Sequence, residues 1–268
     1  MINLAIWLAS FGVADLIAPV SGKQQLELRT WLAFVLSGTT ACGLAVAVGE
    51  SPGGRALATA VVVTTYAGWV WLRMKVEHAD PKEQPAEKGA TERRHKELLA
   101  GWTIGYLMVV FIAVAASAAF LSSPSGGTAR EFSAKLPYAG LADVEFPRLI
   151  LGLGFFVFLQ ASANAVVRLS LASIGTRVHK AEQTLKGGRL IGPLERSLIF
   201  GFALVGAPTA AALVVSAKGL LRFPELNDMR SDEKAVNGTK RIDEVTEYLL
   251  VGSLVSWLLA LAPIPFIL

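Results

Sequence analysis

Charged residues are scarce in this sequence. Asp, Glu, Lys and Arg make up 17% of its 268 residues, against about 25% in an average soluble domain. They are also clustered, which leaves six charge-free apolar runs, at residues 31–49, 56–72, 98–129, 149–167, 197–217 and 248–268. About 20 apolar residues in a helix span a hydrocarbon core of about 30 Å. So many runs of that length exclude a small soluble domain and predict an integral membrane protein.

Recognisable catalytic motifs are also missing. The sequence holds no H-E-x-x-H, no G-x-S-x-G, no Walker lysine and no paired Asp-rich motif. Its three histidines, His78, His95 and His179, lie in polar connections without ligand spacing, so we predict no metal site and no cofactor. The single cysteine, Cys42, excludes a disulfide within the chain and is expected to be a buried thiol. These absences favour a protein that is not an enzyme.

The net charge of +4 follows from basic residues that flank the apolar runs. Lys and Arg at such positions contact anionic headgroups, so membrane lipids are the expected partners. No basic face with interleaved aromatic residues is present, which argues against a nucleic-acid partner.

The apolar runs and the breakers between them predict one all-α domain over residues 1–268, a polytopic transmembrane bundle of about seven spans. The expected helices cover 4–20, 30–48, 55–74, 99–121, 148–174, 192–218 and 242–264. A charged loop is predicted over 75–97, with a helix over 91–99 that continues into the next span. A second loop is predicted over 122–147, and a third, polar, over 227–240.

The distribution of Lys and Arg orients these helices. Cations are concentrated in the first, third and fifth connections and are few in the second and fourth. The positive-inside rule therefore places the odd connections, including 75–97, in the cytoplasm and the N-terminus and 122–147 outside. The sixth connection breaks the pattern, because it carries Lys218, Arg222 and four later cations. Either helix 192–218 is a broken or re-entrant hairpin, or helix 4–20 does not span, which leaves six spans.

Polar residues inside two predicted helices are candidates for a pore or solute-binding lining. Gln160, Asn164 and Arg168 are four residues apart, so on one continuous helix they form a single polar stripe. Asp15 lies among apolar residues; it is either solvated near the helix end or needs a partner, for which Arg168 is a candidate by chemistry alone. The stripe is either a hydrogen-bonded packing seam or the lining of a pathway.

Small residues recur at helical spacing, as at Gly101 and Gly105, and at Ala203, Ala207 and Ala211. Such faces let helix backbones approach closely in lipid. They pack either within one bundle or between subunits, so the expected protein partner is a second copy of the chain or a different protein.

A second set of charges gathers near the C-terminus. Lys218, Arg222 and Arg196 are candidates for an anion or lipid-headgroup site, and Glu195, Glu225 and Glu247 are their candidate acidic partners. A salt-bridged connection between helix ends is the alternative interpretation.

Three stretches carry a resemblance to a known family: GRLIGPLER at 188–196, AKGLLRFPEL at 217–226 and TEYLLVGSLVS at 246–256. With them, about the last 80 residues resemble an uncharacterised family of bacterial polytopic membrane proteins of actinobacterial type. The resemblance implies a multi-pass architecture in a bacterial inner membrane and directs attention to Glu195, Arg196, Lys218, Arg222, Glu225 and Glu247. It implies no activity.

Three functional hypotheses follow. The first is a non-enzymatic membrane protein that moves a solute or ion, or permeabilises the membrane as an oligomer. The second is a scaffold or sensor that signals through its charged loop to a soluble partner. The third is a membrane-embedded enzyme acting on a lipid or phosphorylated substrate.

Overall fold

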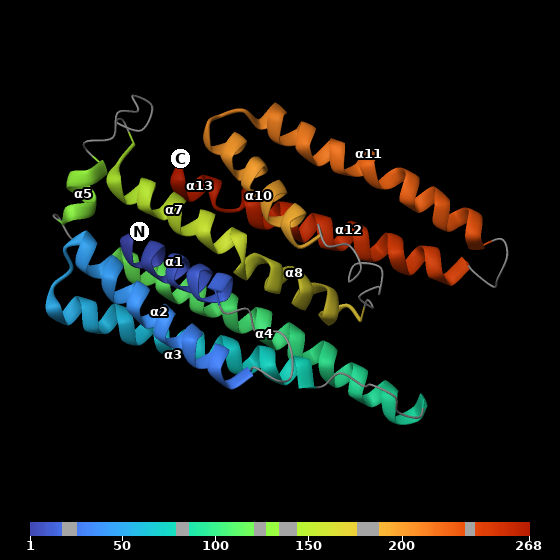
Figure 1. Cartoon of the computed structure of the whole chain (residues 1–268), viewed down its shortest axis with the longest axis horizontal. Coiled ribbons are helices and arrows are strands. Elements are labelled where there is room, and N and C mark those ends of the chain that lie inside the picture. The colour runs from blue at the N-terminus through green and yellow to red at the C-terminus, as the bar shows by residue number, and fades with distance from the viewer. Residues whose placement is uncertain (18–25, 79–85, 121–126, 134–143, 176–187, 234–238) are drawn as a thin grey trace. The chain divides into compact units, whose positions relative to one another are not determined.

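The computed structural model describes residues 1–17, 26–78, 86–120, 127–133, 144–175, 188–233 and 239–268, and in these ranges the chain is helical and contains no strand (Figure 1). The expectation of an all-α protein is confirmed. The helices are α1 (Ile2–Ile17), α2 (Leu26–Val48), α3 (Pro52–His78), α4 (Ala86–Phe120), α5 (Thr128–Ser133), α7 (Phe146–Gln160), α8 (Ser162–Ser173), α10 (Gly188–Leu204), α11 (Pro208–Glu233), α12 (Thr239–Leu261) and α13 (Ile264–Ile267).

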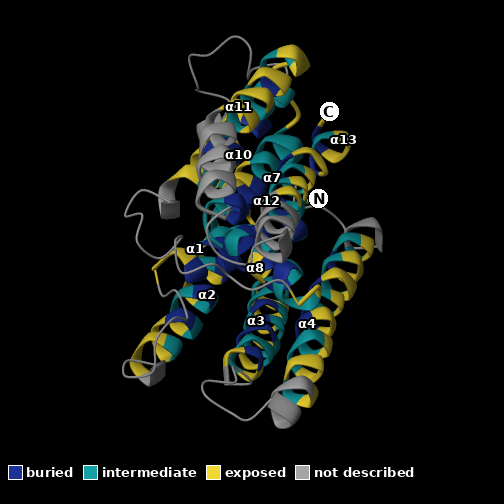
Figure 2. Cartoon of the chain, turned by 90° about the vertical axis from the view of Figure 1, so that its right-hand side faces the viewer, coloured by how far each residue is buried: buried dark blue, intermediate teal, exposed yellow. Residues whose placement is uncertain are grey.

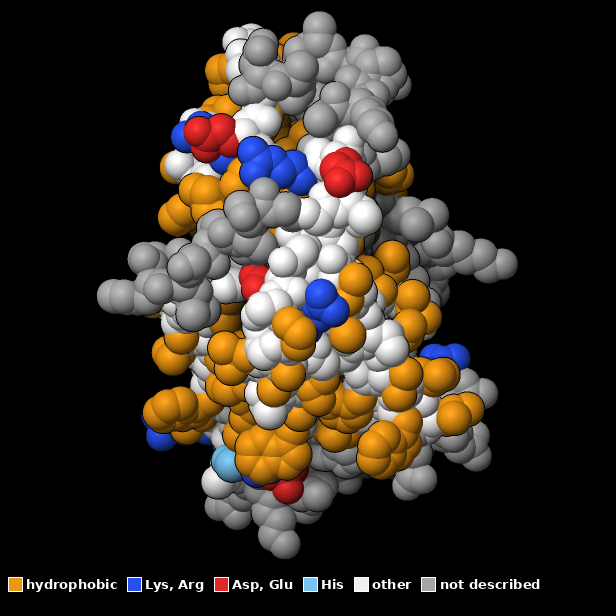
Figure 3. All heavy atoms as spheres, turned by 90° about the vertical axis from the view of Figure 1, so that its left-hand side faces the viewer, with side chains coloured by type: hydrophobic (Ala, Val, Ile, Leu, Met, Phe, Trp, Pro, Cys, Tyr) orange, Lys and Arg blue, Asp and Glu red, His pale blue; other side chains and the backbone are white. Residues whose placement is uncertain are grey.

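Several helices are long and apolar enough to cross a membrane. Within the described ranges there are four, Leu28–Val48, Pro52–Glu77, Thr91–Ser117 and Leu250–Ile267, or five if the bent pair α7 and α8 counts as one span. In an apolar 18-residue window of each of the four, only 22% to 28% of the residues are buried inside the protein. Large hydrophobic side chains are exposed on these helices, with Trp31 69% and Trp102 73% exposed. Hydrophobic side chains also cover part of the face shown in Figure 3. Apolar helices exposed in this way are suited to lipid and not to water.

The chain divides into two compact units, and the first comprises residues 1–78, 102–162 and 265–268. Its central element is α1, which packs against α2, α3 and α7. Eleven of the 16 residues of α1 are buried (Figure 2). A helix that is apolar on every side requires such a position. At about 24 Å, α1 is shorter than a bilayer core of about 30 Å, and other helices cover most of it.

Glycines bring α1 and α7 into backbone contact. A Cβ atom added to Gly12 would lie 2.6 Å from the backbone carbonyl of Val157, and one added to Gly154 would lie 2.8 Å from the carbonyl oxygen of Ala5. Only residues without a side chain allow this approach, as is common where helices associate in lipid.

The pairings in the first unit also show that α1, α3 and α7 run in the same direction. Trp7 bonds to Thr65 and Asp15 bonds to Arg73, so a later residue of α1 contacts a later residue of α3. Ala5 lies near Gly154 and Gly12 near Val157, so the same holds for α1 and α7. The helices α2 and α4 return the chain between them. At the far end of the chain, Arg148 at the start of α7 donates to the carbonyl of Leu268.

The second unit comprises residues 79–101 and 163–264. Here α10 and α11 form a hairpin joined by residues 205–207, with Gly206 at a φ of 72° and Pro208 as the first residue of α11. A glycine in the left-handed region followed by proline at a helix start is a chemically apt turn. Ile199, Ala211 and Ala260 form the apolar centre where α10, α11 and α12 meet.

Several predicted boundaries are therefore wrong. The helix expected over 192–218 is a hairpin of two helices, as one of the alternatives required, and Ala207 of its small-residue series lies in the break. The helix expected over 148–174 is interrupted at Ala161, where α7 and α8 bend by 54°. The bend lies where a continuous helix was expected to align its polar side chains.

Helices also replace parts of the predicted loops. The ends of the loop expected over 75–97 belong to α3 and α4, which confirms the helix predicted over 91–99. The loop expected over 122–147 contains α5 and the start of α7, and most of the loop expected over 227–240 belongs to α11 and α12. The remaining parts of these three loops, and the fifth connection over 176–187, lie outside the described residues.

Candidate functional site

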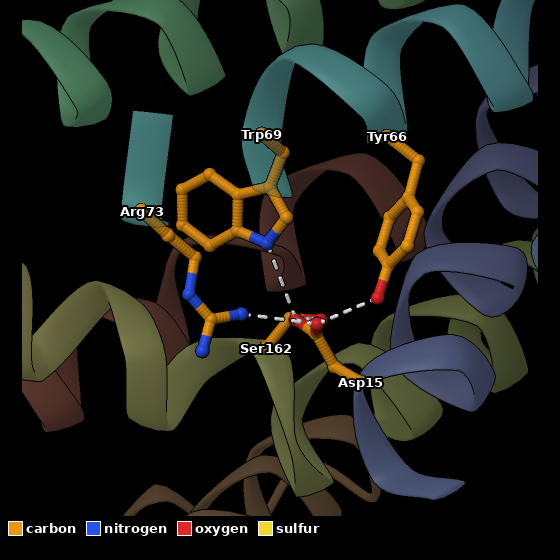
Figure 4. Close-up of polar contacts among 5 residues, drawn as sticks. All are labelled: Asp15, Tyr66, Trp69, Arg73 and Ser162. Carbon is orange, nitrogen blue, oxygen red and sulfur yellow. Dashed lines mark hydrogen bonds and ion pairs between the residues drawn. The ribbon is translucent and has the colours of Figure 1, made fainter. Parts of the chain in front are cut away.

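A buried carboxylate is the centre of the first polar cluster, which we name the Asp15 cluster after Asp15, Tyr66, Trp69, Arg73 and Ser162 (Figure 4). Asp15 retains 6% of its exposure. Its Oδ1 atom accepts hydrogen bonds from the Tyr66 hydroxyl at 3.0 Å and from Arg73 Nη1 at 3.1 Å. Its Oδ2 atom accepts from Trp69 Nε1 at 3.3 Å and from the Ser162 hydroxyl at 2.8 Å. Both oxygens are thus held by donors on other helices.

The spacing of residues along α3 builds most of this cluster. Tyr66, Trp69 and Arg73 are three and then four residues apart, so they lie on one helix face. The Arg73 guanidinium carbon also lies 5.3 Å from the centroid of the Trp69 ring, in cation–π contact.

Asp15 was identified from sequence, but its environment was not. The solvated position near a helix end is wrong, because the side chain is buried. Its ion-pair partner is Arg73, where sequence chemistry had suggested Arg168, whose side chain is exposed on α8. The signal that would have found Arg73 is the Y-x-x-W-x-x-x-R pattern at 66–73, which places donors on one face of a span.

The predicted polar stripe does not form on one helix. Gln160 is the last residue of α7 and donates to the Phe156 carbonyl of its own helix at 3.2 Å. Asn164 and Arg168 belong to α8, beyond the bend. Asn164 takes part in the second cluster, which is described next.

The second cluster, the Glu195 cluster, joins helices α8, α10, α11 and α12. Its members are Asn164, Glu195, Arg196, Lys218, Ser256 and Trp257. Glu195 and Arg196 are 7% and 2% exposed, although both carry charge. Lys218 Nζ lies 2.6 Å from Glu195 Oε2, and Trp257 Nε1 donates to Glu195 Oε1 at 2.9 Å.

Arg196 forms the other half of the Glu195 cluster. Its Nη1 atom donates to the Ser256 hydroxyl at 3.2 Å, and its Nη2 atom donates to Asn164 Oδ1. The Lys218 ammonium also lies 5.9 Å from the centroid of the Trp257 ring. The cluster therefore fastens the α10–α11 hairpin to α12 and α8 through buried polar contacts.

The C-terminal candidates from sequence are only partly brought together. Lys218 pairs with Glu195 across the hairpin, and Arg196 binds neutral groups on α8 and α12. Arg222 and Glu225 belong to α11 and Glu247 to α12. Their side chains lie outside the described part of the structure, so a link between Lys218 or Arg222 and the acids of α12 stays a prediction.

Neither cluster has the composition of a metal site. No group of three or more His, Cys, Asp or Glu side chains with that geometry occurs among the residues whose placement is described. Cys42, expected to be buried, is exposed on α2. The two clusters instead combine one carboxylate each with guanidinium, ammonium, hydroxyl and indole donors. No protein-family model, curated protein or solved structure matches the sequence, so these contacts carry the functional interpretation.

Proposed function

We propose that this protein is a multi-pass protein of the cell membrane that moves a small solute or ion without catalysing a reaction. The observation that carries the proposal is the interruption of a membrane helix beside a buried ion pair. The helix breaks at Ala161, and the first residue beyond the break, Ser162, donates to Asp15. Arg73 of a third helix completes the pair.

Membrane physics favours a transport function for such an arrangement. Ionisable side chains within spanning helices are costly and mark the paths of ions, protons and solutes. Interrupted helices are tolerated where the freed backbone groups are buried in protein or line a cavity, and discontinuous helices supply the solute sites of many transporters. The Asp15 cluster combines both features.

The proposed topology has six crossings and a hairpin. The crossings are α1, α2, α3, α4, the α7–α8 pair and α12, with the N-terminus outside. The hairpin of α10 and α11 enters and leaves from the cytoplasm. It thereby places Lys218 and the later cations on the cytoplasmic side, as the positive-inside rule asks. The parallel course of α1, α3 and α7 supports this order, as does Leu268 beside the start of α7.

An oligomer in lipid is part of the proposal. A Cβ atom at Gly101 or Gly105 would meet nothing within 4 Å. Among the residues that the structure describes, nothing covers this small-residue part of α4, which is therefore available to lipid or to a second copy.

One observation favours the scaffold hypothesis as a second candidate. The 35 residues of α4 extend over about 52 Å, well beyond a hydrocarbon core of about 30 Å. The charged first turns of α4 therefore stand outside the membrane, where a soluble partner can reach them.

Flux through the purified protein in liposomes tests the main proposal. The wild type should release or take up small ions or solutes, and Ser162→Ala should change that flux several-fold, because it removes a donor from the break. Ser170→Ala is the matched control, since the Ser170 hydroxyl bonds only the Val166 carbonyl of its own helix at 2.9 Å. A wild type that moves no ion or solute would refute the proposal.

A further inference from the structure

The donors around Asp15 form a preassembled receptor for a carboxylate. Every polar contact that the described residues make with the Asp15 side chain comes from a donor: guanidinium, phenol, indole or hydroxyl. These donors belong to α3 and to the start of α8, whereas the carboxylate they bind belongs to α1. Donors and acceptor are therefore on separate elements, and the cradle does not depend on the Asp15 backbone for its chemistry.

We propose that this cradle is a binding site for a small monocarboxylate, and that the Asp15 side chain occupies it as a tethered stand-in for that ligand. The inference rests on the proposed transport function and deepens it, because it assigns small monocarboxylates as the solute class. The bound ligand would make the hydrogen bonds that Asp15 makes now.

Charge and shape both select a carboxylate. Arg73 is a largely buried cation, so the group that replaces Asp15 must be an anion if the guanidinium is to remain paired. The donors are divided between the two oxygens, with Tyr66 and Arg73 on Oδ1 and Trp69 and Ser162 on Oδ2. A planar anion with two oxygens on one carbon satisfies that division, whereas a single halide ion does not.

The cradle is also reachable on one side. The Arg73 side chain retains 14% of its exposure, against 4% for Asp15. A ligand that displaces Asp15 can therefore approach along the guanidinium. A carboxylate that takes the place of Asp15 keeps the Arg73 guanidinium paired, so the exchange leaves no lone buried cation.

Atom-matched variants test this site by chemical rescue. Asp15→Ala removes the carboxyl carbon and both oxygens, which are the heavy atoms of formate. Asp15→Gly also removes the β-carbon, which matches acetate. Asp15→Asn keeps the volume and fills the site with an amide, so it is the control in which a ligand finds no empty space.

The measurement is the thermal unfolding midpoint of each detergent-solubilised variant with sodium formate, sodium acetate or sodium chloride at equal ionic strength. We expect formate to raise the midpoint of Asp15→Ala by several degrees relative to chloride. Acetate should raise it by less than formate does. In Asp15→Gly, the rise in midpoint caused by acetate should come closer to that caused by formate or exceed it. Asp15→Ala/Arg73→Ala should show no difference between the salts, and the wild type and Asp15→Asn should show smaller differences than Asp15→Ala, because in both of them the ligand must displace a side chain.

Equal midpoints of Asp15→Ala in formate and chloride would overturn the inference, as would an equal response of Asp15→Asn. If Asp15→Ala does not survive extraction, the protein is purified with either formate or chloride present in every buffer. Monodisperse protein recovered with formate but not with chloride is then the supporting result. Equal recovery, including none, overturns it.

The second experiment measures the flux of labelled formate and acetate into liposomes that contain the wild-type protein. Carboxylate flux together with rescue supports the inference. If the protein moves a different solute but neither formate nor acetate, the assigned solute class is overturned and the transport proposal stands. The absence of flux for every solute refutes the transport proposal itself.

Discussion

Arg73→Met should be one of the most damaging single substitutions in the first unit. It leaves the Asp15 carboxylate buried with Tyr66, Trp69 and Ser162 as its donors and without a counter-charge. Removing one partner of a buried ion pair costs about 3–5 kcal/mol. Three neutral donors remain, and each hydrogen bond to a charged group is worth about 1.5–3 kcal/mol. We therefore expect the lower end, a loss of about 3 kcal/mol in the free energy of unfolding.

A double variant isolates the charge from the packing. Asp15→Asn/Arg73→Met removes both charges, and a neutral replacement of a buried pair is often nearly neutral in stability. Its free energy of unfolding should therefore return to within about 1 kcal/mol of the wild type. The control is Arg55→Met on the same helix, where the Arg55 Nε atom donates to the Glu50 carbonyl at 2.7 Å. Loss of that neutral hydrogen bond should cost about 1 kcal/mol.

Unfolding in mixed micelles, driven by a rising fraction of SDS and followed by circular dichroism, measures all four proteins under one condition. Arg73→Met within about 1 kcal/mol of the wild type would show that the pair carries little of the stability. A double variant as unstable as the single one would show that Arg73 acts through packing and not through charge.

Two further predictions concern packing and topology. Gly12→Ala should lower the free energy of unfolding by about 1–3 kcal/mol, because the added methyl group would meet the α7 backbone 2.6 Å away. Gly43→Ala, with nothing within 4 Å of the added methyl group, should instead raise it by up to about 1 kcal/mol. Unfolding in mixed micelles compares the two variants. In a Cys42→Ala background, an impermeant maleimide applied to intact cells should label Ser51→Cys and not Ser231→Cys. Labelling of both would place the chain after α11 outside and contradict the hairpin topology.

The sequence predicted which stretches are apolar helices better than it predicted where those helices break. Charge-free runs located the membrane helices because hydrocarbon excludes unpaired charge over a fixed length. The break between α10 and α11 had a local signal, since Gly206 and Pro208 disfavour a continuous helix. The break at Ala161 had none, because the residues around it include neither Gly nor Pro. It depends on tertiary contacts, such as that of Ser162 with Asp15.

The same reason explains the limits of the site prediction. Asp15 stood out because a carboxylate in an apolar run needs a partner, but its partner lies 58 residues away in sequence. Chemistry alone could not choose between Arg73 and Arg168. Glu195 was among the candidate acidic partners of Lys218, but the sequence could not select it, because a continuous helix would have held the two residues far apart.

The central position of α1 has a consequence for how the protein is made. The Ser162 hydroxyl that completes the Asp15 cluster is synthesised 147 residues after Asp15 itself. The face of α1 that receives Gly154 waits equally long. Until then this short helix with its buried carboxylate lacks α7, one of the three helices against which it packs. Chains that stop before α7 would present that helix to the membrane quality-control machinery, so biogenesis of this protein depends on keeping an incomplete bundle together until its later helices arrive.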